Sequence, residues 1–298
     1  MASRADLKPK NLSQLELEIQ RSQEPDRNHQ KGGRSFYFFD FDDNVAFLST
    51  KIYLFHQDSG EQIAVSTADY AQNGKLVGKQ GLFKDYNIRL CDETGSFRRF
   101  RDFDPRKMEA VLRSAQPFVE DLMEALGRPD LQWKGPSWSC FYHAAFNQRP
   151  ISVITARGHH PETIRLGIES FVQQGHLPVS PNYLGIYPVS HRETRQKLGD
   201  HEEKMSVAQL KRKAIRQSVE QAFEIYGFNE HHRFGMSDDD PHNVELIIEE
   251  MVQLKKDYPT MSFFVIEAFG DRHTKIEILE DHLNRQPLLS KESQLSFF

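Results

Sequence analysis

Residues 35–45 read SFYFFDFDDNV, a largely aromatic run that ends abruptly in carboxylates. A run this apolar is typical of a strand buried on both faces of a sheet. Asp40 and Asp42 therefore put charge at the strand's carboxyl end, where ligands bind in open α/β sheets. Two carboxylates one residue apart can bind a hard cation or divide the roles of nucleophile and acid. A solvated turn is the alternative interpretation, because Asp and Asn are common in loops.

The composition predicts a globular protein of the cytoplasm. The chain has 298 residues, of which 38% are hydrophobic and 11% aromatic, which is enough for a substantial core. Its net charge of −5 gives no basic field that would favour nucleic acid or a membrane surface. Two cysteines, Cys91 and Cys140, are too few for a disulfide framework and suit a reducing compartment. No window approaches the roughly 20 apolar residues of a membrane span.

Strand-like and helix-like segments alternate along most of the chain. The predicted strands are residues 35–40, 151–155, 183–187, 233–237 and 262–267. Apolar residues at a 3.6-residue period predict helices at 105–126, 161–174, 206–226 and 241–256. Pro117 is expected to break the first of these. This alternation predicts an α/β fold, a mostly parallel sheet with helices on both faces.

Residues 46–104 do not fit the alternation. They begin with a predicted β-hairpin over 51–66 and continue through Gly- and charge-rich stretches. Because they directly follow the carboxylate-ended strand, we interpret them as an inserted α+β cap over the site. The core then comprises 34–45 and 105–283, with a disordered N-terminal tail, 1–33, and a C-terminal tail, 284–298. Within the core, residues 127–149 are interpreted as a second, smaller insertion.

The second strand ends in Thr155, followed by Ala156 and Arg157. A hydroxyl at a strand end before a helix N-terminus can donate to a phosphate oxygen. A helix-initiating threonine is the alternative. The polar side chains after it, Arg157, His159 and His160, could reach a substrate phosphate, but we interpret them as loop surface.

The fourth strand ends in two adjacent aspartates, Asp238 and Asp239. Asp240, which precedes a proline, is typical of a helix N-cap. A lysine-rich helix start, residues 210–215, lies between Thr155 and this strand end, and a solvated helix face is its ordinary interpretation.

The order of these residues, Asp-x-Asp, Thr, Lys and then Asp-Asp, resembles the haloacid dehalogenase-like superfamily of phosphohydrolases. Residues 38–45 (FFDFDDNV) are similar to its first motif and Ile154-Thr155 to its second. Residues 236–244 (MSDDDPHNV) are similar to the adjacent-aspartate form of its fourth motif. Residues 117–126 (PFVEDLMEAL) resemble the helix that usually precedes the second motif. The resemblance implies a Rossmann-like sheet of strand order 3-2-1-4-5.

The resemblance also implies roles for the site residues. Asp40 would be the nucleophile that forms an aspartyl-phosphate, and Asp42 would act first as acid and then as base. The phosphoryl group would be bound by Thr155, Ala156 and a third-motif lysine. For this lysine we prefer Lys213, 25 positions before Asp238, over Lys204 and Lys211. The ligands of a Mg²⁺ ion would be Asp40, Asp238, Asp239 and, through its backbone carbonyl, Asp42.

The function expected from these features is a Mg²⁺-dependent phosphatase that hydrolyses a phosphate monoester. A cap of this size favours a small phosphorylated substrate, and no membrane partner is expected. The adjacent-aspartate motif also occurs in relatives that act on nucleic-acid ends or on phosphoprotein, so the resemblance leaves those substrates open. A phosphotransferase and a non-catalytic, partner-binding member are the alternatives. A receiver-type signalling domain uses similar residues, but in a different order along the chain.

Overall fold

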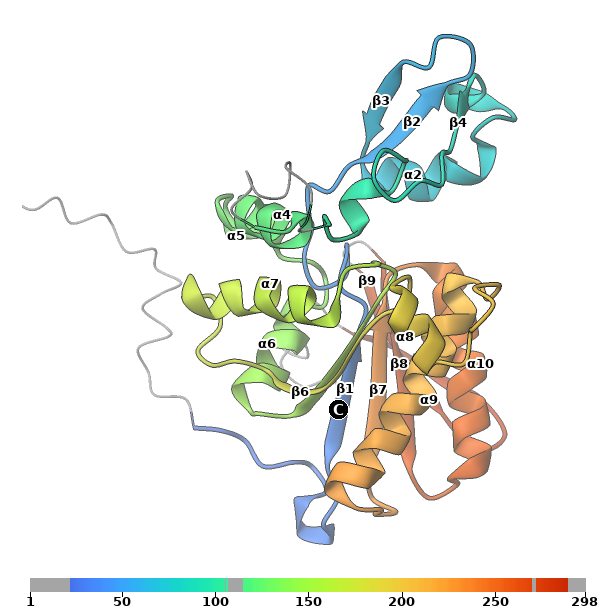
Figure 1. The fold of residues 1–298 in the computed structure, drawn as a ribbon. Coiled ribbons are helices and arrows are strands. Elements are labelled where there is room, and N and C mark those ends of the chain that lie inside the picture. Colours follow the sequence, from blue (N-terminus) through green and yellow to red (C-terminus); the bar gives the residue numbers. More distant parts are fainter. Residues whose placement is uncertain (1–21, 105, 107–114, 270–271, 289–298) are drawn as a thin grey trace, which may run out of the picture.

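The computed structural model describes residues 22–104, 106, 115–269 and 272–288 (Figure 1). Its largest element is a seven-stranded sheet of order β10-β9-β8-β7-β1-β5-β6. The parallel strands are β1 (Ser35–Phe39), β5 (Pro150–Thr155), β6 (Asn182–Pro188), β7 (Arg233–Asp238) and β8 (Ser262–Phe269). Antiparallel strands β9 (Arg272–Ile278) and β10 (Leu283–Leu288) extend the sheet beyond β8. The predicted α/β class with a mostly parallel sheet is confirmed.

Strand β1 lies between β5 and β7 and is buried along its whole length. Phe36 and Phe38 face one core layer, and Tyr37 and Phe39 face the other. Because alternate side chains point to opposite faces and both faces are covered, every position of this strand must be apolar or neutral. The strand's apolar run ends at Asp40, which is itself only 7% exposed.

Helices pack on both faces of the sheet (Figure 1). One layer contains α4 (Pro117–Leu126), α5 (Asp130–Trp133), α6 (Trp138–Phe146) and α7 (Pro161–Gln173). The other contains α9 (Val207–Tyr226) and α10 (Pro241–Asp257), with the short α8 (Arg192–Lys197) before α9. Trp133 and Trp138 contact Phe171 of α7 inside the first core. Residues 127–149 therefore belong to the main unit, and the expectation of a second insertion is wrong.

Residues 46–104, called the inserted unit below, carry a separate sheet of order β3-β2-β4. The predicted hairpin is confirmed as β2 (Ile52–His56) paired antiparallel with β3 (Gln62–Val65). The unit's other elements are β4 (Tyr86–Asn87), α2 (Thr67–Asn73), η3 (Gly74–Leu76), η4 (Gly81–Phe83) and η5 (Arg98–Phe100). Its own small core is Ile52, Leu54, Val65 and Phe83. Figure 1 shows this unit set apart from the seven-stranded sheet.

Both predicted tails, 1–33 and 284–298, include residues that are part of the folded core. Asp26 forms an ion pair of 2.8 Å with Arg149, and both side chains are 9% exposed, so residues 22–33 pack on the core. This stretch also contains the 3-10 helix η2 (His29–Lys31). Residues 283–288 form β10, whose polar sequence suits an exposed edge strand and therefore reads as a tail. Residues 1–21 and 289–298 lie outside the described residues, as does most of 105–114 in the first predicted helix.

Candidate active site

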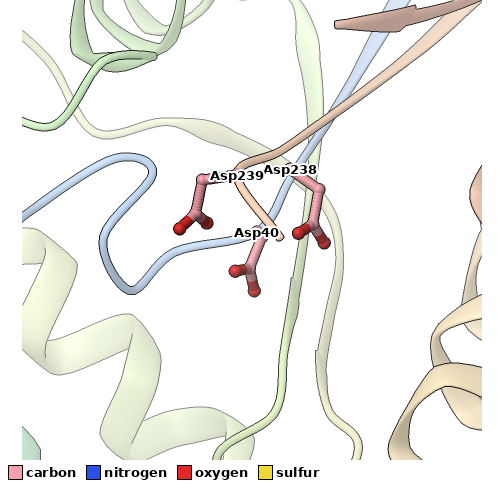
Figure 2. A group of neighbouring side chains, drawn as sticks. All are labelled: Asp40, Asp238 and Asp239. Atoms are coloured by element: carbon pink, nitrogen blue, oxygen red, sulfur yellow. The ribbon is translucent and has the colours of Figure 1, made fainter. Parts of the chain in front are cut away.

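Three carboxylates meet where β1 and β7 end. The two strands are parallel neighbours, and the backbone N–H of Asp40 donates to the carbonyl of Ser237 at 2.9 Å. This register places Asp40 beside Asp238 and Asp239, whose carboxylates lie on one side of the two strand ends in Figure 2. Oxygen atoms of the three side chains lie within 4.8 Å of one another. The sequence prediction that these three acids converge is therefore met by the geometry.

Asn44 joins the same two strand ends from inside the protein. Its fully buried amide donates to the carbonyls of Asp40 at 3.1 Å and Ser237 at 3.0 Å. Its side-chain oxygen accepts from the hydroxyls of Ser137 at 2.8 Å and Ser237 at 3.2 Å. Sequence reasoning gave Asn44 no role. In the sequence Asn44 follows two aspartates, a pattern typical of a turn. Its partners Ser137 and Ser237 are too distant along the chain to be recognised from that pattern.

The lysine at the site is Lys211, and not Lys213. Its ammonium nitrogen lies 3.1 Å from Asp40 Oδ1 and 2.7 Å from Asp238 Oδ2, and its side chain is 2% exposed. Lys213 is exposed on the same helix, and Lys204 pairs with Glu202 at the surface. Helical phase explains the difference, because Lys211 lies three and four residues before the buried Ala214 and Ile215. The preference for Lys213 ignored that phase.

The cluster holds more acidic groups than its one ammonium can neutralise. Burial, with Asp238 and Asp239 nearby, raises the pKa of Asp40 well above its usual value despite Lys211. Burial and Asp238 raise the pKa of Asp239 to about 8. Burial alone lowers the pKa of Lys211, but Asp238 and Asp40 raise it above its usual value, so the ammonium persists. When all three carboxylates are ionised they exceed the one ammonium by two negative charges, and their oxygen atoms are ligands of the kind that Mg²⁺ takes.

Asp42 lies apart from that cluster and is held by the second motif. Its carboxylate accepts from the Thr155 hydroxyl at 3.3 Å and from Arg157 Nε and Nη2 at 2.6–3.1 Å. Of the four expected metal ligands, Asp42 is thus the one whose side chain points elsewhere, which leaves its backbone carbonyl for that role. Thr155 is fully buried at the end of β5, and Ala156 beyond it is exposed.

The interpretation of residues 157–160 as loop surface is wrong for two of its three side chains. Arg157 is fully buried because Asp42 neutralises it and the rings of Phe100 and Phe118 lie 4.8 and 4.9 Å from its guanidinium carbon. His159 is also fully buried, and burial, together with Arg157, lowers its pKa well below the usual value. His160 is exposed and caps α7.

The structural role expected of Asp240 is confirmed. Its side chain accepts from the backbone N–H of His242 at 2.9 Å and starts α10. The neighbouring aspartates therefore differ in function, since Asp238 and Asp239 face the site and Asp240 faces the helix N-terminus.

Comparisons with protein-family models, with curated proteins and with solved structures gave no match. Within the described part of the chain, no helix combines the length and apolar character needed to cross a bilayer. The resemblance to the haloacid dehalogenase-like superfamily thus rests on the motifs in the sequence, and the geometry above is the independent observation that bears on function.

Proposed function

We propose that this protein is a Mg²⁺-dependent phosphatase of the haloacid dehalogenase-like superfamily that hydrolyses a phosphate monoester. The observation that carries the proposal is the meeting of Asp40, Asp238, Asp239 and the Lys211 ammonium at the ends of two parallel strands. In this proposal the five parallel strands are a Rossmann-like core of order 3-2-1-4-5, and the inserted unit is its cap. Cys91 and Cys140 are not joined in a disulfide, which suits a location in the cytoplasm.

The first step transfers the phosphoryl group to Asp40. A carboxylate oxygen of Asp40 attacks phosphorus, the bond from phosphorus to the ester oxygen breaks, and Asp42 gives that oxygen a proton. Thr155 and Lys211 donate hydrogen bonds to the phosphoryl oxygens. Lys211 is suited to this because it is charged, fixed by two carboxylates and buried, so its charge is poorly screened.

The second step returns Asp40 to its free form. Asp42 takes a proton from a water molecule, whose oxygen attacks phosphorus and displaces Asp40. The residues that would hold the cation are Asp40, Asp238 and Asp239. When bound, the cation would reduce repulsion between Asp40 and the dianionic substrate and neutralise charge that develops on the phosphoryl group.

The inserted unit favours a small phosphorylated substrate. Thr67, the first residue of α2, hydrogen-bonds the side chain of Asp43, so this unit reaches the edge of the site. Asp43 itself has a left-handed backbone with φ of 58°, a conformation that aspartate adopts more readily than most residues other than glycine. A unit seated this close restricts the approach of a bulky phosphoester.

The test is release of inorganic phosphate from a panel of sugar phosphates, nucleotides, phosphoserine peptides and phosphorylated oligonucleotides. With Mg²⁺ we expect turnover of at least one class, and Asp40→Asn should lower it by a factor on the order of 10³ or more. Adding an acceptor alcohol distinguishes a phosphotransferase, because part of the phosphate would then appear as a new ester.

Asp240→Asn is the matched control. It makes the same chemical change two residues from Asp238, but asparagine also caps helices, so activity should be retained. Equal activity of Asp40→Asn and the unsubstituted protein would rule out the aspartyl-phosphate route. A folded protein inactive on the whole panel would point instead to a partner-binding role.

A further inference from the structure

Arg157 holds Asp42 in one orientation. Its Nε lies 2.9 Å from Asp42 Oδ2 and its Nη2 lies 2.6 Å from Oδ1, a two-point contact that only the planar guanidinium can make. Asp42 is 19% exposed, whereas Arg157 is completely buried. The direction of this partly exposed carboxylate is therefore set by a buried cation inside the protein.

The position of Arg157 is set in turn by the two ends of the inserted unit. Its outgoing segment contains Thr50, and its returning segment contains Arg99, Phe100 and Arg101. From the outgoing segment, the Thr50 hydroxyl accepts from Arg157 Nη2 at 2.7 Å. From the returning segment, the Phe100 ring lies 4.8 Å from the guanidinium carbon. The Phe100 carbonyl also accepts from the N–H of Gly158 at 2.8 Å, and the backbone of Arg101 forms an isolated parallel β-bridge with Gly158. Both segments therefore meet on one side chain.

Helix α4 contacts both segments through Asp121. The Thr50 hydroxyl donates to Asp121 Oδ2 at 2.6 Å, and Arg99 of the returning segment pairs with Asp121 Oδ1. Thr50 and Asp121 are 1% and 3% exposed, so these contacts are shielded from solvent. A change in how the inserted unit sits thus alters contacts that end at Asp42.

We propose that Arg157 is a positioning residue for the acid–base group Asp42, and that the seating of the inserted unit acts on proton transfer through it. This inference rests on the proposed function. Arg157 touches no reacting atom in this scheme. It keeps Asp42 directed at the ester oxygen and at the attacking water, and it does so only while Thr50 and Phe100 hold its guanidinium.

Leaving-group dependence tests this role in the Mg²⁺-loaded protein. Phenyl phosphate needs a proton on its departing oxygen, whereas p-nitrophenyl phosphate needs it much less. For Arg157→Gln we expect kcat/KM to fall about 100-fold with phenyl phosphate and less than about fivefold with p-nitrophenyl phosphate. Arg157→Lys should recover only part of the loss because an ammonium lacks the two-point contact. Equal losses on both esters would overturn the proposal and indicate a direct contact of Arg157 with the phosphate.

Arg149→Gln is the matched control, since Arg149 and its partner Asp26 are each 9% exposed and lie away from the site. It should leave the ratio of the two kcat/KM values unchanged. Thr50→Val removes the hydroxyl between Arg157 and Asp121 at nearly constant volume, and should change that ratio in the same direction as Arg157→Gln. An unchanged ratio in Thr50→Val would show that Arg157 acts without the inserted unit.

Hydrogen exchange separates this inference from the proposed function. If the unsubstituted protein releases no phosphate, the proposed function fails, but the coupling is still measurable. Thr50→Val should then raise amide exchange about tenfold both in residues 41–46 and in residues 155–160. Faster exchange confined to the inserted unit would overturn the coupling.

Discussion

Replacing Lys211 with methionine removes the ammonium between Asp40 and Asp238 while keeping an unbranched stem. Lys211 and Asp238 are 2% and 0% exposed, so the variant leaves carboxylates buried without their counter-charge. Breaking a buried pair in this way costs about 3–5 kcal/mol of unfolding free energy. The carboxylates can take up protons instead, so the loss should be largest at high pH and shrink toward about pH 6.

Removing Lys211 should strengthen Mg²⁺ binding while it weakens catalysis. Without Lys211 the cluster carries more negative charge, so the cation should bind more tightly and restore more stability than in the unsubstituted protein. Phosphatase activity should nevertheless fall by about 10²–10³-fold, because no ammonium remains to stabilise the phosphoryl oxygens.

Thermal unfolding with and without Mg²⁺ measures both effects. The metal-free Lys211→Met protein should unfold on the order of 10 °C lower than the unsubstituted protein. Lys213→Met is the control, two residues further along the same helix but exposed, and should change stability by less than about 0.5 kcal/mol. If both variants lose the same stability, or Mg²⁺ raises both melting temperatures equally, Lys211 is not the counter-charge of this cluster.

Three further outcomes follow from buried polar groups. Because the pKa of Asp239 is about 8, Mg²⁺ must displace its proton at lower pH. Calorimetry should therefore show about 100-fold weaker Mg²⁺ binding at about pH 6 than above about pH 8. An affinity that does not change with pH would contradict this. His159 takes up a proton on unfolding because burial lowers its pKa, so stability should fall as pH drops below about 6.5, and urea titrations should show a flatter pH profile for His159→Phe. Asn44→Ala leaves two buried carbonyls without their amide donor and should cost about 1–3 kcal/mol in the same assay.

The acid cluster could be predicted because each acid follows a recognisable strand. Once residues 35–39 and 233–238 are identified as buried strands of a parallel sheet, their carboxyl ends must share an edge. That argument needs no knowledge of distant contacts. The choice of lysine needed only the phase of one helix, and applying the 3.6-residue period to α9 would have selected Lys211.

Other features depend on contacts between distant parts of the sequence. Arg157 stands in a polar stretch that reads as a surface loop, and only its pairing with Asp42, 115 positions earlier, makes its burial favourable. Strand β10 has no buried side chain, so its sequence lacks the apolar alternation that identifies strands. In both cases the stabilising partner is absent from any local window of sequence.

The two ends of the inserted unit are joined by a backbone hydrogen bond between Tyr53 and Ser96. The N–H of Tyr53 donates to the carbonyl of Ser96 at 3.0 Å, and Ser96 is fully buried there. The chain thus departs and returns through one point, beyond the residues that contact Arg157. Residues 54–95 can therefore vary in length without displacing the strands that carry the aspartates, while Thr67 within them keeps one contact with Asp43. Sequence change confined to these residues thus alters the approach to the acid cluster and leaves the strands beneath it unchanged.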